Sequence, residues 1–273
     1  MGLLDKAQQS DGPAWNARSS VGSAIPRLAV VVPMYNEIRG AETCVRTLLG
    51  VLQRLDIPTN LIVVDDGSHD GTGDLIDRLQ TTLGTFLAVH QPNGGYGRAL
   101  VRGAQEAHAH GFDYVVFMDS DLTNPPEHIF RFVPAILDGA DLVKGTRFTL
   151  GGDMDAVRWR RRVFSILGNL VARACFRMGI ADCTNGFRAI RTDLFLAMPL
   201  TERGFAEILE ELYWAKRWGA RVVSVPTSLT ERTGEQRATS FQYGPRVLWS
   251  YLKYALRAAV LSYHPNARSS VEN

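Results

Sequence analysis

Two aspartates separated by one residue, Asp119 and Asp121, follow a strongly apolar segment of the chain. A hard divalent cation such as Mg²⁺ or Mn²⁺ binds one or two protein carboxylates and completes its shell with phosphate oxygens and water. The pair therefore suggests a metal site for a phosphate-bearing ligand. Taken alone, the pattern is more typical of a solvated turn before a helix, so the interpretation depends on other segments.

A second pair of carboxylates, Asp65 and Asp66, also ends an apolar segment. A carboxylate in this position can accept hydrogen bonds from a nucleobase or a ribose, while Asp70 or Thr72 caps the next helix. Turn and cap chemistry alone explains this stretch equally well. The glycines at 71–73 and 93–97 lack the third glycine of a dinucleotide fingerprint and the Lys-Ser/Thr ending of a P-loop, which disfavours a nicotinamide enzyme and a P-loop ATPase.

These polar segments stand at the ends of short apolar runs that alternate with amphipathic stretches. We expect strands over 28–33, 61–66, 85–90, 114–119 and 140–147, and helices over 41–55, 74–83, 96–110 and 127–137. The alternation predicts an α/β fold with a mostly parallel, Rossmann-like sheet that helices cover on both faces. Ligands bind at the carboxyl ends of the strands in such sheets, so the polar clusters should form one site.

The second half of the chain predicts a long helix over 158–178, a helix over 205–218, a strand over 220–226 and a last helix over 244–262. We expect a flexible tail at 1–25, a single catalytic domain at 26–243, and a C-terminal amphipathic helix and tail at 244–273. On the last helix, one stripe is basic and consists of Arg246, Ser250, Lys253 and Arg257. A broad apolar face lies beside this stripe. The stripe could meet anionic lipid head groups, although an ordinary domain helix or a dimer contact is at least as good an interpretation.

The composition is that of an ordinary globular protein. Of the 273 residues, 45% are hydrophobic and 21% charged, which excludes wholesale disorder, and the formal net charge of +2 is too small for a general nucleic-acid coat. Three cysteines without C-x-x-C spacing disfavour a disulfide framework or a zinc site. The sequence shows neither the apolar core of a signal peptide nor an apolar run of ~18 residues, so we expect a cytoplasmic location. Peripheral contact with the cytoplasmic face of a membrane is a further option.

Several segments in this order resemble the family 2 glycosyltransferases of the GT-A fold, most closely the polyprenyl-phosphate (dolichol-phosphate) mannose synthases. The resemblance covers roughly residues 28–240 and rests on VVPMYNE (31–37), VVDDGSHDGTGD (63–74), NGGYGRAL (93–100), MDSDLTNPPE (118–127), KGTRF (144–148), WRRRVFS (159–165), DCTNGFRAI (182–190) and the stretch from Val225 to Glu235. It implies an inverting, metal-dependent transfer of a hexose from a nucleoside-diphosphate sugar to a polyprenyl phosphate. Mannose and GDP-mannose are the favoured sugar and donor.

The same resemblance implies roles for individual residues. The donor nucleotide would be bound by Pro33, Tyr35, Glu37, Asp65 and Asp119, with Asp66 close by. Asp119 and Asp121 would hold Mg²⁺ or Mn²⁺. The catalytic residues would be Asp121, Arg147, Arg161 and Arg232, and the acceptor or its phosphate would be bound by Arg147, Arg161, Arg232 and Arg237. Glu210 matches a family glutamate, whereas Thr123 stands where mannose synthases often have a glutamine, and Gln236-Arg237 replaces Ser-Lys.

The nature of the acceptor follows from charge. A phosphate monoester, with a second pKa near ~6, is already an anion at neutral pH and needs cationic positioning more than a general base. The arginines at 158 and 160–162 favour such an acceptor, although arginine clusters often only solvate a helix face. A hydroxyl acceptor such as a sugar or natural product remains an alternative, as do UDP-glucose or UDP-N-acetylglucosamine as donor. A non-catalytic subunit that binds a nucleotide sugar is the third interpretation.

Overall fold

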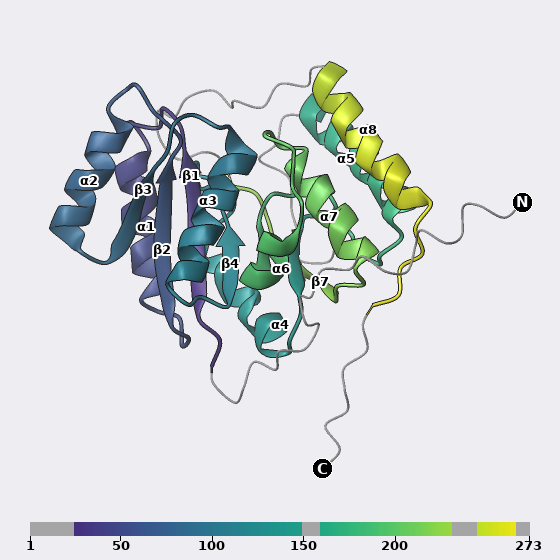
Figure 1. Cartoon of the computed structure of the whole chain (residues 1–273), viewed down its shortest axis with the longest axis horizontal. Helices are drawn as coiled ribbons and strands as arrows, with labels where there is room; N and C mark the ends of the chain where they lie inside the picture. Colours follow the sequence, from purple (N-terminus) through teal and green to yellow (C-terminus); the bar gives the residue numbers. More distant parts are fainter. Residues whose placement is uncertain (1–24, 149–158, 231–244, 266–273) are drawn as a thin grey trace, which may run out of the picture.

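The computed structural model describes residues 25–148, 159–230 and 245–265 (Figure 1). Within these ranges one sheet has the strand order β3-β2-β1-β4-β6-β5-β7. The strands are β1 (Leu28–Met34), β2 (Thr59–Asp65), β3 (Phe86–His90), β4 (Tyr114–Phe117), β5 (Leu142–Thr146), β6 (Arg188–Arg191) and β7 (Val222–Pro226). β6 runs antiparallel to its neighbours β4 and β5, and the other adjacent strands are parallel.

Helices cover both faces of this sheet. They are α1 (Ala41–Leu52), α2 (Thr72–Leu83), α3 (Tyr96–Ala109), the 3₁₀ helix η1 (Pro126–Arg131), α4 (Val133–Leu137), α5 (Trp159–Phe176), α6 (Thr192–Ala197), α7 (Glu207–Arg217) and α8 (Pro245–Ala259). α8 packs against α5 and α7 at the end of the molecule remote from β3 (Figure 1). The α/β architecture with a mostly parallel sheet is therefore confirmed.

The apolar strands were recognisable because both of their faces are buried. Along β1, Ala29 and Val31 join the core that contains residues of α3 and α7. Val30 and Val32 point the opposite way, into the core shared with α1 and η1. A strand between two cores has no solvent-facing side, so its sequence is a continuous apolar run.

Three elements differ from the sequence prediction. The helix expected over 127–137 is divided at Phe132 into η1 and α4. β6 and α6 were not predicted: β6 has only four residues, two of them arginines, and shows no apolar run.

One residue of the basic stripe predicted on the C-terminal helix differs from its expected position, whereas Arg257 of the same stripe is exposed. Lys253, expected on an open basic stripe, donates to Glu202 Oε1 at 3.1 Å and lies against the protein. The exposed side of α8 is instead largely apolar, as shown by Trp249 and Leu252. No helix in the described ranges combines the length and apolar character needed to cross a bilayer.

Candidate active site

The strand order brings the predicted polar segments to one edge of the sheet. β2, β1 and β4 are direct neighbours, and β5 follows beyond β6. Since β1, β2, β4 and β5 run in the same direction, the residues that follow them emerge on the same side. The four segments therefore lie where a ligand of an α/β sheet would bind.

The turns after β1 and β2 are joined by hydrogen bonds. Asn36 adopts a φ of +56°, which asparagine tolerates better than most residues. Its N–H donates to Ser68 Oγ at 2.9 Å, and its Oδ1 accepts from the His69 N–H at 2.8 Å. The Glu37 N–H donates to Thr72 Oγ1 at 2.9 Å. These bonds hold the two predicted nucleotide-binding segments in one arrangement.

Among the residues expected to bind the nucleoside, Asp65 is buried, at 6% exposure, and Tyr35 is exposed. Asp65 Oδ1 accepts from the Ser68 N–H at 3.1 Å, and its Oδ2 lies 3.2 Å from His90 Nδ1. Pro33 lies within β1, in register with Val64 of β2. The Asp65 carboxylate is thus oriented by its own turn and by β3, and a carboxylate has lone pairs left for a ligand.

His90 is a support of Asp65 that the sequence did not reveal. Its Nε2 lies 2.9 Å from Asp77 Oδ1, so the ring bridges two aspartates. Burial lowers the pKa of His90, but the hydrogen bonds to Asp77 and Asp65 outweigh it, and the net pKa is raised above 6.5. The bridging imidazole therefore favours its protonated form.

Asp66 holds the start of α3. Asp66 is 3% exposed. Its Oδ1 accepts hydrogen bonds from Gln91 Nε2 at 2.6 Å and from the Gly94 N–H at 2.8 Å. Its Oδ2 accepts a hydrogen bond from the Gly95 N–H at 2.8 Å. The N–H groups of Gly94 and Gly95 in this glycine turn therefore point to Asp66. Contact between Asp66 and a nucleotide stays a prediction.

The first turn of α3 packs closely against the segment 201–205. The Gly97 N–H donates to the Arg203 carbonyl at 2.9 Å, and a Cβ on Gly97 would lie 2.3 Å from the Glu202 carbonyl oxygen. Only glycine fits at this approach. The Tyr96 ring, one residue earlier, stacks on Phe205 with centroids 4.6 Å apart.

Glu210, which the resemblance singled out, anchors that same segment. It is 2% exposed and accepts hydrogen bonds from the N–H groups of Thr201 at 2.9 Å and Glu202 at 2.7 Å, and from the Tyr254 hydroxyl of α8 at 2.7 Å. Through these contacts, Glu210 of α7 joins α8 to the segment that packs against the start of α3.

The carboxylate pair after β4 is oriented by neighbouring hydroxyl groups. Tyr96 Oη donates to Asp119 Oδ1 at 3.3 Å. Asp121 Oδ1 accepts from the Thr123 N–H at 3.1 Å and from Thr123 Oγ1 at 2.8 Å, across a turn in which Leu122 has a φ of +54°. Thr123 thus fixes the orientation of Asp121.

The donor set fits a hard divalent cation. Both Asp119 and Asp121 are partly exposed, and no cluster of three or more His, Cys, Asp or Glu side chains in the described ranges could hold a metal. A cation at this pair would take most of its shell from phosphate oxygens and water, as Mg²⁺ and Mn²⁺ commonly do. The pair therefore fits a metal that arrives with a diphosphate better than a permanently caged one.

Thr230, the last described residue before the segment that carries Arg232 and Arg237, is hydrogen-bonded to this turn. The Thr230 N–H donates to the Thr123 carbonyl at 2.9 Å. Arg232 and Arg237 themselves lie outside the described residues, so their predicted roles stay predictions. The hydrogen bond does hold Thr230 itself at the turn that contains Asp121.

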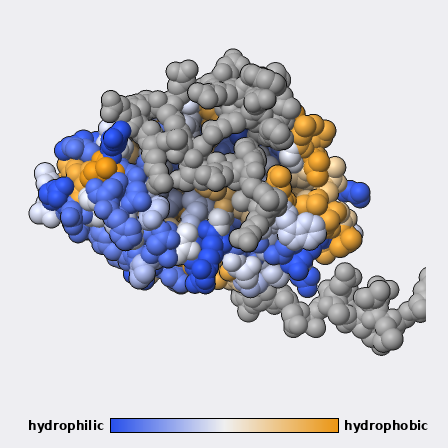
Figure 2. Space-filling model, turned by 90° about the horizontal axis from the view of Figure 1, so that it is seen from above, coloured by the Kyte–Doolittle hydropathy of each residue, from blue (hydrophilic) through white to orange (hydrophobic). Residues whose placement is uncertain are grey.

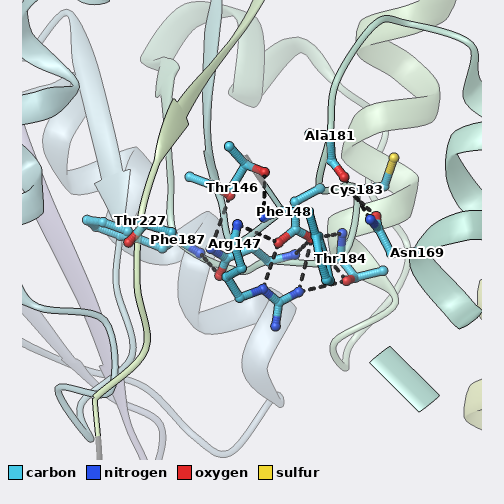
Figure 3. Close-up of polar contacts among 12 residues, drawn as sticks. Thr146, Arg147, Phe148, Asn169, Ala181, Cys183, Thr184, Phe187 and Thr227 are labelled. Carbon is cyan, nitrogen blue, oxygen red and sulfur yellow. Dashed lines mark hydrogen bonds and ion pairs between the residues drawn. The ribbon is translucent and has the colours of Figure 1, made fainter. Parts of the chain in front are cut away.

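Arg147, at the end of β5, is held by a carboxylate (Figure 3). Its Nε donates to Asp182 Oδ2 at 2.6 Å and its Nη2 to Asp182 Oδ1 at 3.0 Å and Thr184 Oγ1 at 3.0 Å. The Arg147 side chain is 11% exposed and that of Asp182 is fully buried. Arg161 lies in α5, but its side chain is not among those described.

A buried ionic cluster lies beside Tyr96. Arg188 is fully buried and pairs with Glu207 at 2.7 Å and Glu211 at 2.8 Å, while its Nη1 donates to the Gly186 carbonyl at 2.8 Å. The charge of Arg188 acts on the Tyr96 hydroxyl. Charged side chains that are fully buried must be paired, so the cluster fixes β6 on α7.

Three supporting residues were missed because their partners are distant in sequence. Tyr96, His90 and Asp182 reach Asp119, Asp65 and Arg147 across 23, 25 and 35 residues, respectively. The available signal was their position: Tyr96 and Asp182 lie in segments that carry the resemblance, and His90 ends the strand predicted over 85–90.

Comparison with known families identifies this chain as a glycosyltransferase. A family model described as "Glycosyl transferase family 2" matches residues 29–197, and the chain belongs to this family. It is 33% identical to polyprenol monophosphomannose synthase of Mycolicibacterium smegmatis, over 76% of this chain and 78% of that protein. It is 31% identical to undecaprenyl-phosphate mannosyltransferase of Micrococcus luteus, over 81% of this chain and 91% of that protein.

Solved structures show the same fold. Glucosyl-3-phosphoglycerate synthase from Mycobacterium tuberculosis superposes with a TM-score of 0.61 at 21% identity, over 90% of this chain and 86% of that one. A structure of that enzyme with Mn²⁺, UDP-glucose and phosphoglyceric acid superposes with a TM-score of 0.60 at 21% identity, over 90% of this chain and 85% of that one. Mannosyl-3-phosphoglycerate synthase from Rubrobacter xylanophilus superposes with a TM-score of 0.61 at 17% identity, over 85% of this chain and 73% of that one. The GT-A fold expected from the sequence is thus confirmed.

Proposed function

We propose that this protein transfers a hexose, with mannose from GDP-mannose favoured, to a polyprenyl phosphate, using Mg²⁺ or Mn²⁺ and inverting the anomeric carbon. The observation that carries the proposal is the placement of the Asp119 and Asp121 pair and of Arg147 at one edge of the sheet. The two mannosyltransferase relatives support the sugar and the acceptor. The structural relative with Mn²⁺ and UDP-glucose supports the metal.

On the donor side, Asp119 and Asp121 would hold the cation against the diphosphate. The bound cation would neutralise negative charge that develops on the departing diphosphate. The residues of this chain supply the preorganisation: Thr123 orients Asp121, and Tyr96 orients Asp119. Asp65 would accept hydrogen bonds from the nucleoside, and its position is fixed before the ligand arrives.

On the acceptor side, Arg147 would bind the phosphate of the lipid. A phosphate monoester is largely dianionic at neutral pH, so its oxygen attacks without a general base. The task of the protein is then to place that oxygen in line with the anomeric carbon and opposite the diphosphate. A single displacement of this kind inverts the configuration.

We also propose peripheral contact with a membrane, where a polyprenyl phosphate resides. α5 and α8 pack against each other and, with the residue that follows α8, expose a set of apolar side chains, here named the α5–α8 face: Ile166, Leu167, Leu170, Val171, Leu248, Trp249, Leu252, Leu256 and Val260. Figure 2 shows apolar side chains gathered at this end of the molecule. Arg173 and Arg257 are exposed on the same helices and would meet anionic head groups.

The transfer reaction is tested with purified protein, Mg²⁺ or Mn²⁺, a panel of GDP- and UDP-sugars and a short polyprenyl phosphate. Mass spectrometry should detect a glycosyl phospholipid from GDP-mannose, and the product should disappear with Asp121→Ala and with a chelator. The anomeric configuration of the product, read by NMR, tests inversion. Product from a UDP-sugar alone would refute the donor, and metal-dependent donor hydrolysis without lipid product would indicate a hydroxyl acceptor.

The membrane contact is tested by co-sedimentation with vesicles of phosphatidylcholine and phosphatidylglycerol. The double variant Leu170→Glu/Leu252→Glu should lose binding, because it places two charges on the α5–α8 face. Leu137→Glu is the matched control, since Leu137 is 56% exposed on α4, away from that face (Figure 1). Equal binding by the double variant and the control would contradict this contact.

A further inference from the structure

The geometry of Arg147 leaves one edge of its guanidinium available. Asp182 accepts from Nε and Nη2, and Thr184 Oγ1 accepts a second hydrogen bond from Nη2. Within the described part of the chain, Nη1 has no hydrogen-bond acceptor, and the side chain is 11% exposed. An arginine clamped along one edge keeps its charge and a donor for an anion on the other edge.

Asp182 is built to remain a carboxylate. Its Oδ1 also accepts from the N–H groups of Thr184 and Asn185, both at 3.1 Å. Burial raises the pKa of Asp182, but the charge and hydrogen bonds of Arg147 outweigh it, and the net pKa is lowered. The clamp therefore keeps its charge across the working pH range.

The clamp is attached to α5 by a second side chain. Asn169 of α5 is 3% exposed; its Nδ2 donates to the Ala181 carbonyl at 2.7 Å, and its Oδ1 accepts from the Cys183 N–H at 2.7 Å. The two bonds grip the backbone immediately before and after Asp182 (Figure 3). The same helix contributes Leu170 to the exposed α5–α8 face.

We propose that Asp182 is the positioning residue for acceptor binding, orienting Arg147 toward the lipid phosphate, and that Asn169 sets this clamp relative to α5. The inference rests on the proposed function, because it assigns Arg147 to the acceptor phosphate. It goes further in naming the residues that act through Arg147 without touching substrate. A free arginine side chain loses rotamer entropy when it binds an anion, and the clamp removes that cost in advance.

The test separates acceptor binding from donor binding in steady-state kinetics. Asp182→Asn should raise the KM for polyprenyl phosphate ~10-fold while the KM for the donor sugar nucleotide stays within about 2-fold. Asn169→Ala should shift the same KM in the same direction. In the Arg147→Lys background, Asp182→Asn should add little further change, since it acts through the guanidinium.

A matched control accounts for the loss of a buried ion pair. Asp141 pairs with Arg191 at 3.3 Å near the opposite end of β5, so Asp141→Asn removes a comparable buried carboxylate charge away from the site. It should leave the KM for polyprenyl phosphate unchanged. Parallel changes in both KM values, or an unchanged acceptor KM in Asp182→Asn, would overturn the inference.

A milder variant keeps the test usable if Asp182→Asn does not fold. Thr184→Val preserves side-chain shape and removes one acceptor of Arg147 Nη2. It should raise the acceptor KM by a few-fold and leave the donor KM unchanged, and an unchanged acceptor KM would likewise overturn the inference. If the wild-type protein transfers no sugar to a polyprenyl phosphate, the proposed function itself fails; normal wild-type transfer with unchanged variants refutes only the positioning role.

Discussion

Replacing Tyr96 with phenylalanine should weaken metal binding without disturbing the fold. The change removes the hydroxyl that donates to Asp119 Oδ1 at 3.3 Å and keeps the ring that stacks on Phe205. Burial and the charge of Asp119 raise the pKa of Tyr96 well above 10, so the hydroxyl stays a proton donor at any working pH. Its loss removes one of the interactions that orient Asp119, a predicted metal ligand.

The magnitude follows from the geometry of this bond. A hydrogen bond to a charged group contributes about 1.5–3 kcal/mol, and the 3.3 Å distance places this one at the lower end. A loss of about 1.4 kcal/mol corresponds to a tenfold change in affinity. We therefore expect the Mn²⁺ concentration for half-maximal transfer to rise ~10-fold, within the range known for residues that support metal ligands.

The assay is an Mn²⁺ titration of transfer activity, together with the electron paramagnetic resonance signal of free Mn²⁺ in the presence of nucleotide. Tyr114→Phe is the matched control, because the Tyr114 hydroxyl is also buried but donates to the Ala140 carbonyl at 2.8 Å. The control should lose some stability and keep its Mn²⁺ affinity. Wild-type Mn²⁺ affinity in Tyr96→Phe, or the same shift in both variants, would refute the reasoning.

Three further variants probe the framework of the site. Arg188→Met should lower the free energy of unfolding, measured in urea, by about 3–5 kcal/mol, because it leaves two buried glutamates without their cation. A loss below about 1 kcal/mol would show that the cluster is dispensable. Gly97→Ala should lower the free energy of unfolding by about 1–3 kcal/mol and weaken nucleotide binding, since the new Cβ would meet the Glu202 carbonyl. Unchanged nucleotide affinity in calorimetry would contradict this. His90 has a raised pKa, so its stabilisation is complete below the unfolded value of about 6.5 and is lost as pH rises through the folded value. The thermal midpoint advantage of wild type over His90→Gln should shrink as the pH rises above about 6.5, and a constant advantage would refute the assignment.

The parts of the fold that could be predicted are those whose signal lies within the element itself. β1, β2 and β4 are apolar runs because both faces of the sheet are covered. β6 gives no such signal, since Arg188 and Arg191 are buried by ion pairs with glutamates and aspartates elsewhere in the chain. Burial of a charged residue depends on a partner that only the tertiary structure identifies.

The candidate site shows the same division. The strand-end segments were placed correctly because α/β topology brings the ends of parallel strands together. The individual pairings were not predictable: nothing local joins Arg147 to Asp182, or Asp66 to the turn at Gly94. Lys253 had the spacing of an open stripe, but Glu202 draws it against the protein.

The position of β6 determines the order in which the sheet can be completed during synthesis. β1, β2, β3 and β4 pair only with one another until β6 arrives, so their half of the sheet can form early. β5 must wait, because both of its neighbours, β6 and β7, are made after it. Until then β4 presents an unpaired edge and β5 has no strand to join, which exposes the nascent chain to aggregation. The strand directly before Arg147 therefore gains both of its neighbours only after β6 and β7 have been made, later than the strands that carry the predicted nucleotide-binding segments.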